Sequence, residues 1–197
     1  MKILDNAKDY YGAYFSPSWH AGLRSGRYYS APYASVAATA VAADTIYWSV
    51  VEIPEAATIV ELGFTVTTTG TATLANVGLY KVAAGNLTAM SLPSAISVSS
   101  TGDKTATIST PVTPGMYMIG IVFNGTSTIN TQTVTGPGGA AAFLSAVHGN
   151  STSSESATAV LRGLSTAYPY AALPGATYAL SNAVYGNTLL PHLWYRV

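Results

Sequence analysis

Between residues 45 and 123 the chain consists of short segments in which apolar and polar side chains alternate. The clearest segment covers residues 58–67, where Val60, Leu62, Phe64 and Val66 fall on one face and mainly polar residues fall on the other. A period of two residues is typical of a half-buried strand in an antiparallel sheet. Turns rich in Gly, Pro and Asn separate the segments at short intervals, as in sandwiches. We therefore predict an all-β fold, an antiparallel β-sandwich of the jelly-roll type.

Residues 116–123 form a segment that is apolar on both faces. Tyr117, Ile119, Ile121 and Phe123 share one face, while the opposite face carries Met116, Met118 and Val122. A strand that is apolar on both faces has to be covered on both sides. A loop, an arm or another subunit would therefore cover its outer face. We expect a subunit interface at Met116, Met118 and Val122.

The first 33 residues differ from the rest of the chain. They are rich in aromatic side chains interleaved with Gly and Pro, and neither a helical nor a strand period fits them. We predict an extended arm over residues 1–33 and a sandwich domain over residues 34–197. Such an arm needs a surface on which to bury its aromatic rings. We expect it to dock the chain onto a partner through Tyr10, Tyr11, Tyr14, Phe15 and Trp19.

The scarcity of charge excludes several classes of function. Eight basic and eight acidic residues make up 8% of the 197 residues, against about 25% in an ordinary domain. The basic residues form no cluster, so we expect no nucleic-acid partner. No apolar run approaches the ~20 residues of a spanning helix, so we expect no membrane segment. We expect Thr and Ser hydroxyls and covering subunits to keep such a chain in solution.

Motifs for catalysis or metal binding are weak. Residues 163–167 approach a nucleophile elbow but lack its second Gly, and we interpret them as a loop. Glu52 and Glu55 flank a proline, and we interpret them as a solvated strand end rather than a glycosidase pair. A metal site would need the fold or a symmetry axis to bring together the three histidines, which are His20, His148 and His192. We predict no catalytic residue, no metal and no cofactor, and thus no enzyme.

Aromatic residues near the end of the chain suggest a different kind of site. Sugars bind by stacking their apolar CH faces on Tyr or Trp rings, with amides and hydroxyls nearby to orient them. The candidates for glycan binding are Tyr168, Tyr170, Tyr178, Tyr185 and Trp194. The alternative is that these tyrosines only pack on the sandwich or on a neighbouring chain, with their hydroxyls at the rim.

The order of several short motifs resembles jelly-roll modules of tailed-bacteriophage virions, which occur in tail fibres, head spikes and related appendages. The resemblance covers about residues 26–123 and the last ten residues, and its motifs are at 26–29, 53–59, 77–80, 106–109 and 113–117. It implies a structural virion protein that is assembled in the host cytoplasm and docks onto other virion proteins through the arm. It further implies a homo-oligomer, for which we expect a trimer, and contact with host-surface polysaccharide. The alternative is a stand-alone carbohydrate-binding module.

Overall fold

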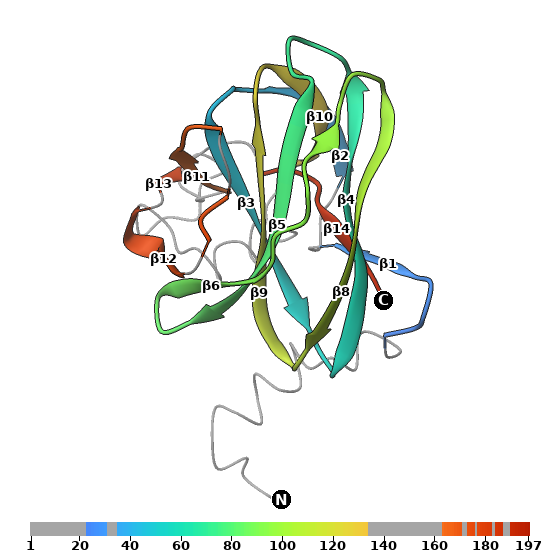
Figure 1. The fold of residues 1–197 in the computed structure, drawn as a ribbon, viewed down its shortest axis with the longest axis vertical. Coiled ribbons are helices and arrows are strands. Elements are labelled where there is room, and N and C mark those ends of the chain that lie inside the picture. Colours follow the sequence, from blue (N-terminus) through green and yellow to red (C-terminus); the bar gives the residue numbers. More distant parts are fainter. Residues whose placement is uncertain are drawn as a thin grey trace, which may run out of the picture.

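The fold is an antiparallel β-sandwich, as the alternating segments predict (Figure 1). The computed structural model describes residues 23–30, 35–133, 163–170, 173–175, 177–182, 184–186 and 190–197. Every strand pair in this part of the chain is antiparallel. No described helix has the length and hydrophobicity needed for a membrane crossing.

The first sheet is organised around one long central strand. Its members are β1 (Tyr28–Ser30), β2 (Ser35–Val41), β4 (Ala57–Thr68), β8 (Gly102–Val112), β10 (Ser127–Thr133) and β14 (Trp194–Arg196). One edge of β4 pairs with β8, and its other edge pairs first with β14 and then with β10. The strand β1 extends the sheet beyond β14, and β2 extends it beyond β10. The final strand of the chain therefore lies inside this sheet.

The second sheet curls into a half-barrel. Its members are β3 (Thr45–Ile53), β5 (Leu74–Ala83), β6 (Asn86–Ser91), β7 (Ile96–Ser97), β9 (Gly115–Phe123), β11 (Gly163–Ala167), β12 (Thr177–Ala179) and β13 (Val184–Gly186). Along the sheet the order is β12-β6-β5-β9-β3-β11-β13, and β7 pairs with β5. A short 3-10 helix, η2 (Leu180–Asn182), follows β12.

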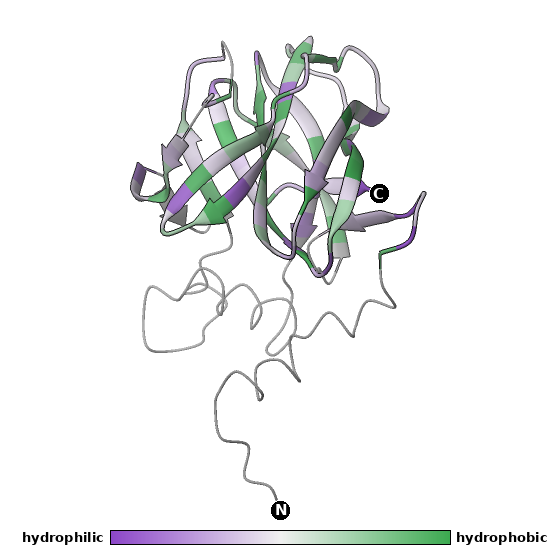
Figure 2. Ribbon diagram, turned by 60° about the horizontal axis from the view of Figure 1, so that its bottom comes forward, coloured by the Kyte–Doolittle hydropathy of each residue, from purple (hydrophilic) through white to green (hydrophobic). Residues whose placement is uncertain are grey.

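The main hydrophobic core lies between the two sheets. Leu62 and Phe64 enter it from β4, and Ile119, Ile121 and Phe123 enter it from β9. All five side chains are fully buried. Strongly hydrophilic residues are scattered over the strands rather than gathered in one patch (Figure 2). The faces expected to be internal for residues 62–66 and 117–123 are thus confirmed.

A β-bulge changes which residue at the start of β4 faces the core. The register with β8 shifts between Ile59 and Glu61, and an extra residue in one strand reverses the side-chain alternation at that point. Ile59 is therefore fully buried, while Val60 is only half-buried. The expectation that Val60 faces the core with Leu62 is wrong, because a period of two is interrupted by a bulge.

The pair Gly85 and Asn86 favours a loop over residues 83–92, but residues 86–91 form the strand β6. The turn at Ala84 and Gly85 joins β5 to β6, and both residues have positive φ, 48° and 78°. Two successive residues of this kind make the hairpin turn whose twist matches that of the flanking strands. Residues 163–167, also expected to be a loop, form β11 and pair with both β3 and β13. The nucleophile-elbow fragment is therefore part of a sheet.

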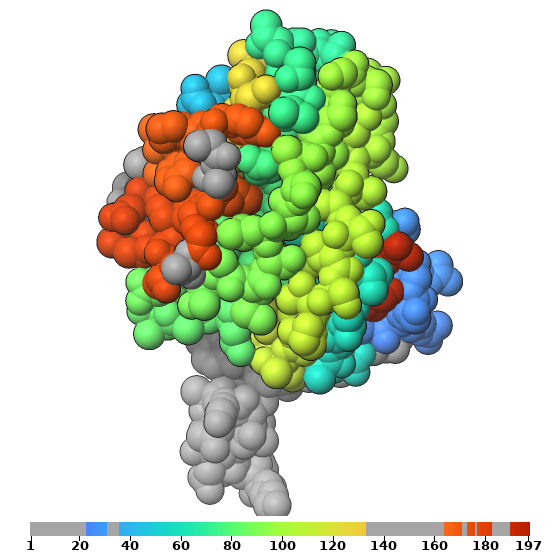
Figure 3. Space-filling model, in the orientation of Figure 1, coloured from blue at the N-terminus to red at the C-terminus, as the bar shows by residue number. Residues whose placement is uncertain are grey.

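A second hydrophobic cluster fills the concave side of the curled sheet. It contains Trp48, Met118 and Val122, which are covered by residues such as Leu164 and Tyr178 of the same chain. Figure 3 shows the described part of residues 163–182, in orange, against the green residues of β5 and β6. Met118 and Val122 are 5% and 0% exposed. They are therefore covered by the chain itself and not by a second subunit, and Met116 packs at the margin of the same cluster.

One tyrosine links the two ends of the curl. The hydroxyl of Tyr178 on β12 donates to Oγ1 of Thr166 on β11, at 2.8 Å. The ring of Tyr178 is 8% exposed and lies against Trp48, with 5.7 Å between the ring centroids. Since β12 and β11 lie near opposite ends of the strand order, this hydrogen bond connects the two sides of the curled sheet.

Part of the segment assigned to the arm belongs to the sandwich. Tyr28–Ser30 forms β1 and pairs with β14. The backbone N–H of Gly26 also donates to the carbonyl of Val197. The ring of Tyr29 stacks on Tyr195 at 5.5 Å between centroids. The sandwich thus begins before residue 34, whereas Tyr10, Tyr11, Tyr14, Phe15 and Trp19 lie outside the described residues.

Candidate functional site

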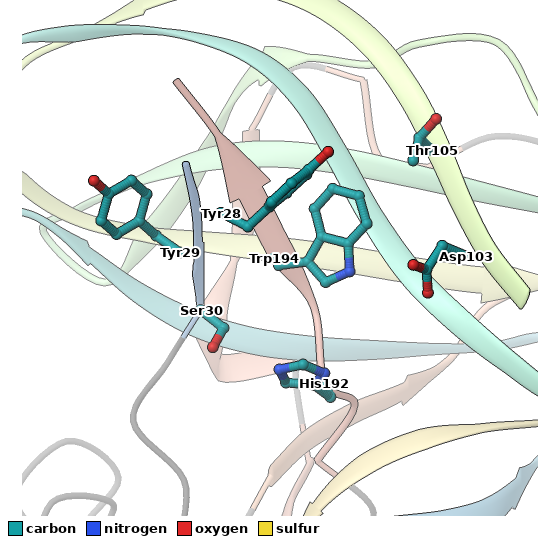
Figure 4. Close-up of a pocket in the computed structure, with 7 residues that line it drawn as sticks. All are labelled: Tyr28, Tyr29, Ser30, Asp103, Thr105, His192 and Trp194. Carbon is teal, nitrogen blue, oxygen red and sulfur yellow. The ribbon is translucent and has the colours of Figure 1, made fainter. Parts of the chain in front are cut away.

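The candidate site is a pocket on the outer face of the first sheet. Its volume is about 310 Å³, at the low end of the range for small-molecule sites. The residues that line it come from β1, β8, β14 and the segment before β14, and they are Tyr28, Tyr29, Ser30, Asp103, Thr105, His192 and Trp194 (Figure 4). The two ends of the described chain therefore meet a hairpin strand at this pocket.

Trp194 reaches the pocket because a glycine lies beside it. In the register of the sheet, Gly63 on β4 pairs with Trp194 on β14 and with Thr105 on β8. A Cβ atom at position 63 would lie 2.1 Å from Cη2 and Cζ2 of Trp194. The six-membered ring thus occupies the space where a side chain of residue 63 would stand. A glycine opposite an aromatic residue allows the ring to cover the strand backbone.

Tyr28 supplies the second aromatic ring of the pocket. It meets Trp194 edge-to-face, with 4.8 Å between the ring centroids and an interplanar angle of 84°, a favourable geometry for aromatic pairs. Tyr28 is 60% exposed, an unusually high value for so large an aromatic side chain. In Figure 4, Tyr28 and Trp194 lie on one side of β1, while Tyr29 points to the other side.

An ion pair fixes the strand that carries Trp194. The guanidinium Nε and Nη2 of Arg196 lie 2.8 and 2.5 Å from Oε2 of Glu61. Glu61 is 8% exposed, so burial of its negative charge would destabilise the fold if Arg196 did not pair with it. The guanidinium also lies 5.8 Å from the centroid of the Tyr28 ring, within the range of a cation–π contact. Arg196 thus holds β1, β4 and β14 together.

Acceptor groups lie beside the rings on β8. The hydroxyl of Thr65 donates to Oδ1 of Asp103 at 2.6 Å, which orients this carboxylate. A carboxylate has about four acceptor positions, and the Thr65 bond uses one of them. Asp103 and Thr105 are both exposed and lie on the side of the pocket that faces Trp194 in Figure 4. The site therefore combines aromatic surface with hydroxyl and carboxylate oxygens.

His192 lies at the edge of the pocket, in the segment before β14. Its backbone N–H donates to the carbonyl of Asn130 at 3.0 Å, which ties this segment to β10. Burial lowers the pKa of His192 below its ordinary value, and the negative charge of Asp103 acts in the opposite direction. Because the burial effect is the larger, the imidazole is neutral at pH 7.

The five residues expected to bind glycan lie in different places. Trp194 lines the pocket. Tyr178 is buried beneath the curled sheet, and Tyr168 and Tyr170 pack at the margin of the same cluster, which agrees with the packing alternative. The side chain of Tyr185 lies outside the described residues. The structure thus separates Trp194 from the tyrosines with which the sequence grouped it.

Sequence reasoning missed Tyr28, Asp103 and Thr105 as partners of Trp194. Tyr28 was assigned to the arm, and no local pattern links it to a strand that lies more than 160 residues later. The alternation of His192, Trp194 and Arg196 in the last strand was the available signal, since it marks one polar and aromatic face. Among the described residues, no three His, Asp or Glu side chains gather as a metal site requires.

Comparison of the chain with known protein families, with curated proteins and with solved structures gives no match.

Proposed function

We propose that this chain is a non-enzymatic, glycan-binding component of a tailed-phage virion or phage-like particle, carried on a fibre or spike. The observation that carries the proposal is the pairing of Tyr28 and Trp194 beside Asp103 and Thr105 on an open sheet face. The exposed ring of Tyr28 and the half-buried ring of Trp194 offer a stacking surface for the CH face of a sugar, and oxygens beside them accept hydrogen bonds from its hydroxyls. The resemblance of residues 26–123 to virion appendage modules supplies the virion context.

The arrangement favours binding over catalysis. Glu61 is held by Arg196, which leaves Asp103 as the carboxylate that lines the pocket. Most glycosidases need two carboxyl groups about 5–9 Å apart across the scissile bond. The described residues around this pocket offer one carboxylate and no second group in the complementary role, so the proposal is a binding site.

The test compares the full chain with two variants. Purified wild-type protein, Trp194→Ala and Tyr178→Phe are applied to surface polysaccharides of candidate hosts and to an array of purified glycans. We expect Trp194→Ala to lose about tenfold or more in affinity, as removal of an anchoring aromatic residue does. Tyr178→Phe should bind as the wild type does, because Tyr178 lies in the other sheet. Equal binding by wild type and Trp194→Ala would contradict the proposal.

The virion part of the proposal is tested separately. Antibody labelling of purified particles in the electron microscope should place the chain on a head or tail appendage. We propose that residues 1–33 dock onto other virion proteins, so deletion of residues 1–22 should abolish incorporation into particles while the sandwich still binds glycan. Absence of label from particles would contradict the virion role and leave the binding role standing.

One observation favours a stand-alone carbohydrate-binding module as the second candidate. The second apolar face of β9 is covered by Leu164, Leu173 and Tyr178 of the same chain, so this face requires no further subunit. A stand-alone module would sediment as a monomer and bind glycan without particles. The virion component should instead form a homo-oligomer, for which we propose a trimer. Analytical ultracentrifugation of the full chain distinguishes the two.

A further inference from the structure

Charge in the pocket indicates which class of sugar it takes. Of the described residues that line the pocket, Asp103 is the one that carries a full charge at neutral pH. The guanidinium of Arg196, 5.8 Å from the centroid of the Tyr28 ring, is bound to Glu61, so this pair contributes no net charge. Arg196 also pairs with Tyr28 in the register of the sheet, two positions along the register from the pair of Ser30 and Trp194. The pocket is therefore negative.

The other titratable groups do not reverse this sign. His192 is neutral at pH 7 because of its burial. Tyr28 and Tyr29 are phenols, which are uncharged at this pH. Lys104 neighbours Asp103 on β8, but successive side chains of a strand point to opposite faces, and its Nζ donates to Ser100 Oγ at 2.8 Å. No cation among the described residues lines the pocket.

The hydrogen-bonding groups point to the same conclusion. The Asp103 carboxylate can only accept hydrogen bonds, and the hydroxyls of Ser30 and Thr105 can donate or accept. Neutral sugars present hydroxyl groups that donate to a carboxylate, and such charge-assisted bonds are about twice as strong as neutral ones. A uronic or sialic acid would instead bring a second carboxylate to Asp103.

We propose that the pocket binds an uncharged sugar residue, stacked on Trp194 and Tyr28 and held by Asp103, and that Asp103 excludes acidic sugars. This inference rests on the proposed function, whose site it deepens. Two like charges about 6 Å apart repel each other. At an effective dielectric constant between that of bulk water and that of a protein surface, this repulsion corresponds to roughly a tenfold loss of affinity. Specificity for one class of ligand arises from repulsion of the wrong ligand as well as from attraction of the right one.

The test uses a glycan array that displays neutral hexoses, N-acetylhexosamines, hexuronic acids and sialic acids. The variant Asp103→Asn keeps the shape of the side chain and an oxygen that can accept from Thr65, but removes the charge. We expect the wild type to bind neutral sugars, and the preference for neutral over acidic sugars to fall about tenfold in Asp103→Asn. The matched control is Asp44→Asn, which removes one negative charge in the turn before β3 and keeps an oxygen that can accept from the Tyr170 N–H. Its preference should equal that of the wild type.

Salt provides a second measurement that needs no variant. Raising the ionic strength screens repulsion between exposed charges, so the preference of the wild type should weaken in high salt. The inference is overturned if Asp103→Asn keeps the wild-type preference for neutral over acidic sugars. It is also overturned if the wild type binds acidic sugars and Trp194→Ala abolishes this binding. In the latter case the proposed glycan-binding function survives. Absence of binding to every sugar on the array would overturn both.

Discussion

The contact between Gly63 and Trp194 gives the sharpest prediction about the site. In Gly63→Ala, the new Cβ would stand 2.1 Å from two ring carbons of Trp194 and 2.6 Å from a third. Carbon atoms pack at about 3.5–4.0 Å, so the ring has to move by roughly 1.5 Å. Trp194 is only half-buried, and its ring can therefore tilt outward into the pocket. We expect a loss of about 1–3 kcal/mol in the free energy of unfolding, the usual cost of overpacking.

Gly→Ala substitutions at two other glycines provide reference values for the expected loss of stability. Gly120 lies opposite Trp48, and a Cβ there would be 2.5 Å from a ring carbon. Trp48 is fully buried and cannot move outward, so Gly120→Ala should cost more than Gly63→Ala. A Cβ at Gly175 would meet nothing within 4 Å, so Gly175→Ala should change stability by less than about 1 kcal/mol.

Urea unfolding followed by far-UV circular dichroism measures the three free energies, and sugar binding is measured on the same proteins. The expected order of destabilisation is Gly120→Ala, then Gly63→Ala, then Gly175→Ala. Gly63→Ala should lose sugar binding because the displaced ring fills the pocket, while Gly175→Ala should keep it. If Gly63→Ala matches Gly175→Ala in both stability and binding, Trp194 does not rest on Gly63, and the description of the pocket is refuted.

Two further predictions concern Tyr178 and His192. Tyr178→Phe removes the hydrogen bond to Thr166 and should lower the free energy of unfolding by about 0.5–1.5 kcal/mol, whereas Tyr178→Ala removes a buried ring and should lower it by about 3–5 kcal/mol. Thermal unfolding measures both losses, and equal losses would mean that the ring does not pack as described. Because the pKa of folded His192 is lowered, the unfolded chain binds the proton first as the pH falls, so stability should decrease from about pH 6.5 downward. His192→Gln should remove this part of the pH dependence in urea titrations between pH 7 and 5, and an unchanged slope would contradict the assigned burial.

Much of the architecture could be predicted from local patterns. Alternation identified the strand around Leu62 and Phe64, which are buried as expected. The two apolar faces of 116–123 correctly indicated a strand covered on both sides. These successes share one reason, which is that side-chain alternation is a property of a single strand and needs no knowledge of its neighbours.

The errors came from features that interrupt or extend beyond one strand. The bulge at Ile59 reversed the expected burial of Val60, and no residue type in that segment predicts a bulge. Met118 and Val122 are covered by Leu164, Leu173 and Tyr178, which the sequence pattern did not connect to them. Coverage by the chain itself and coverage by another subunit require the same apolar residues on the strand, so the pattern alone did not distinguish them.

The sequence alone determined that this chain forms antiparallel strands with an aromatic last segment, because hydrophobic period and turn residues are local. The position of Tyr28 beside Trp194, the space that Gly63 leaves for the Trp194 ring and the place of Asp103 at the same pocket became apparent from the three-dimensional arrangement of the strands. Pairing and register depend on contacts between distant segments, and a shift of one residue would turn every side chain of a strand to the opposite face. The site is a product of that register, since its residues lie in rows across β1, β14, β4 and β8.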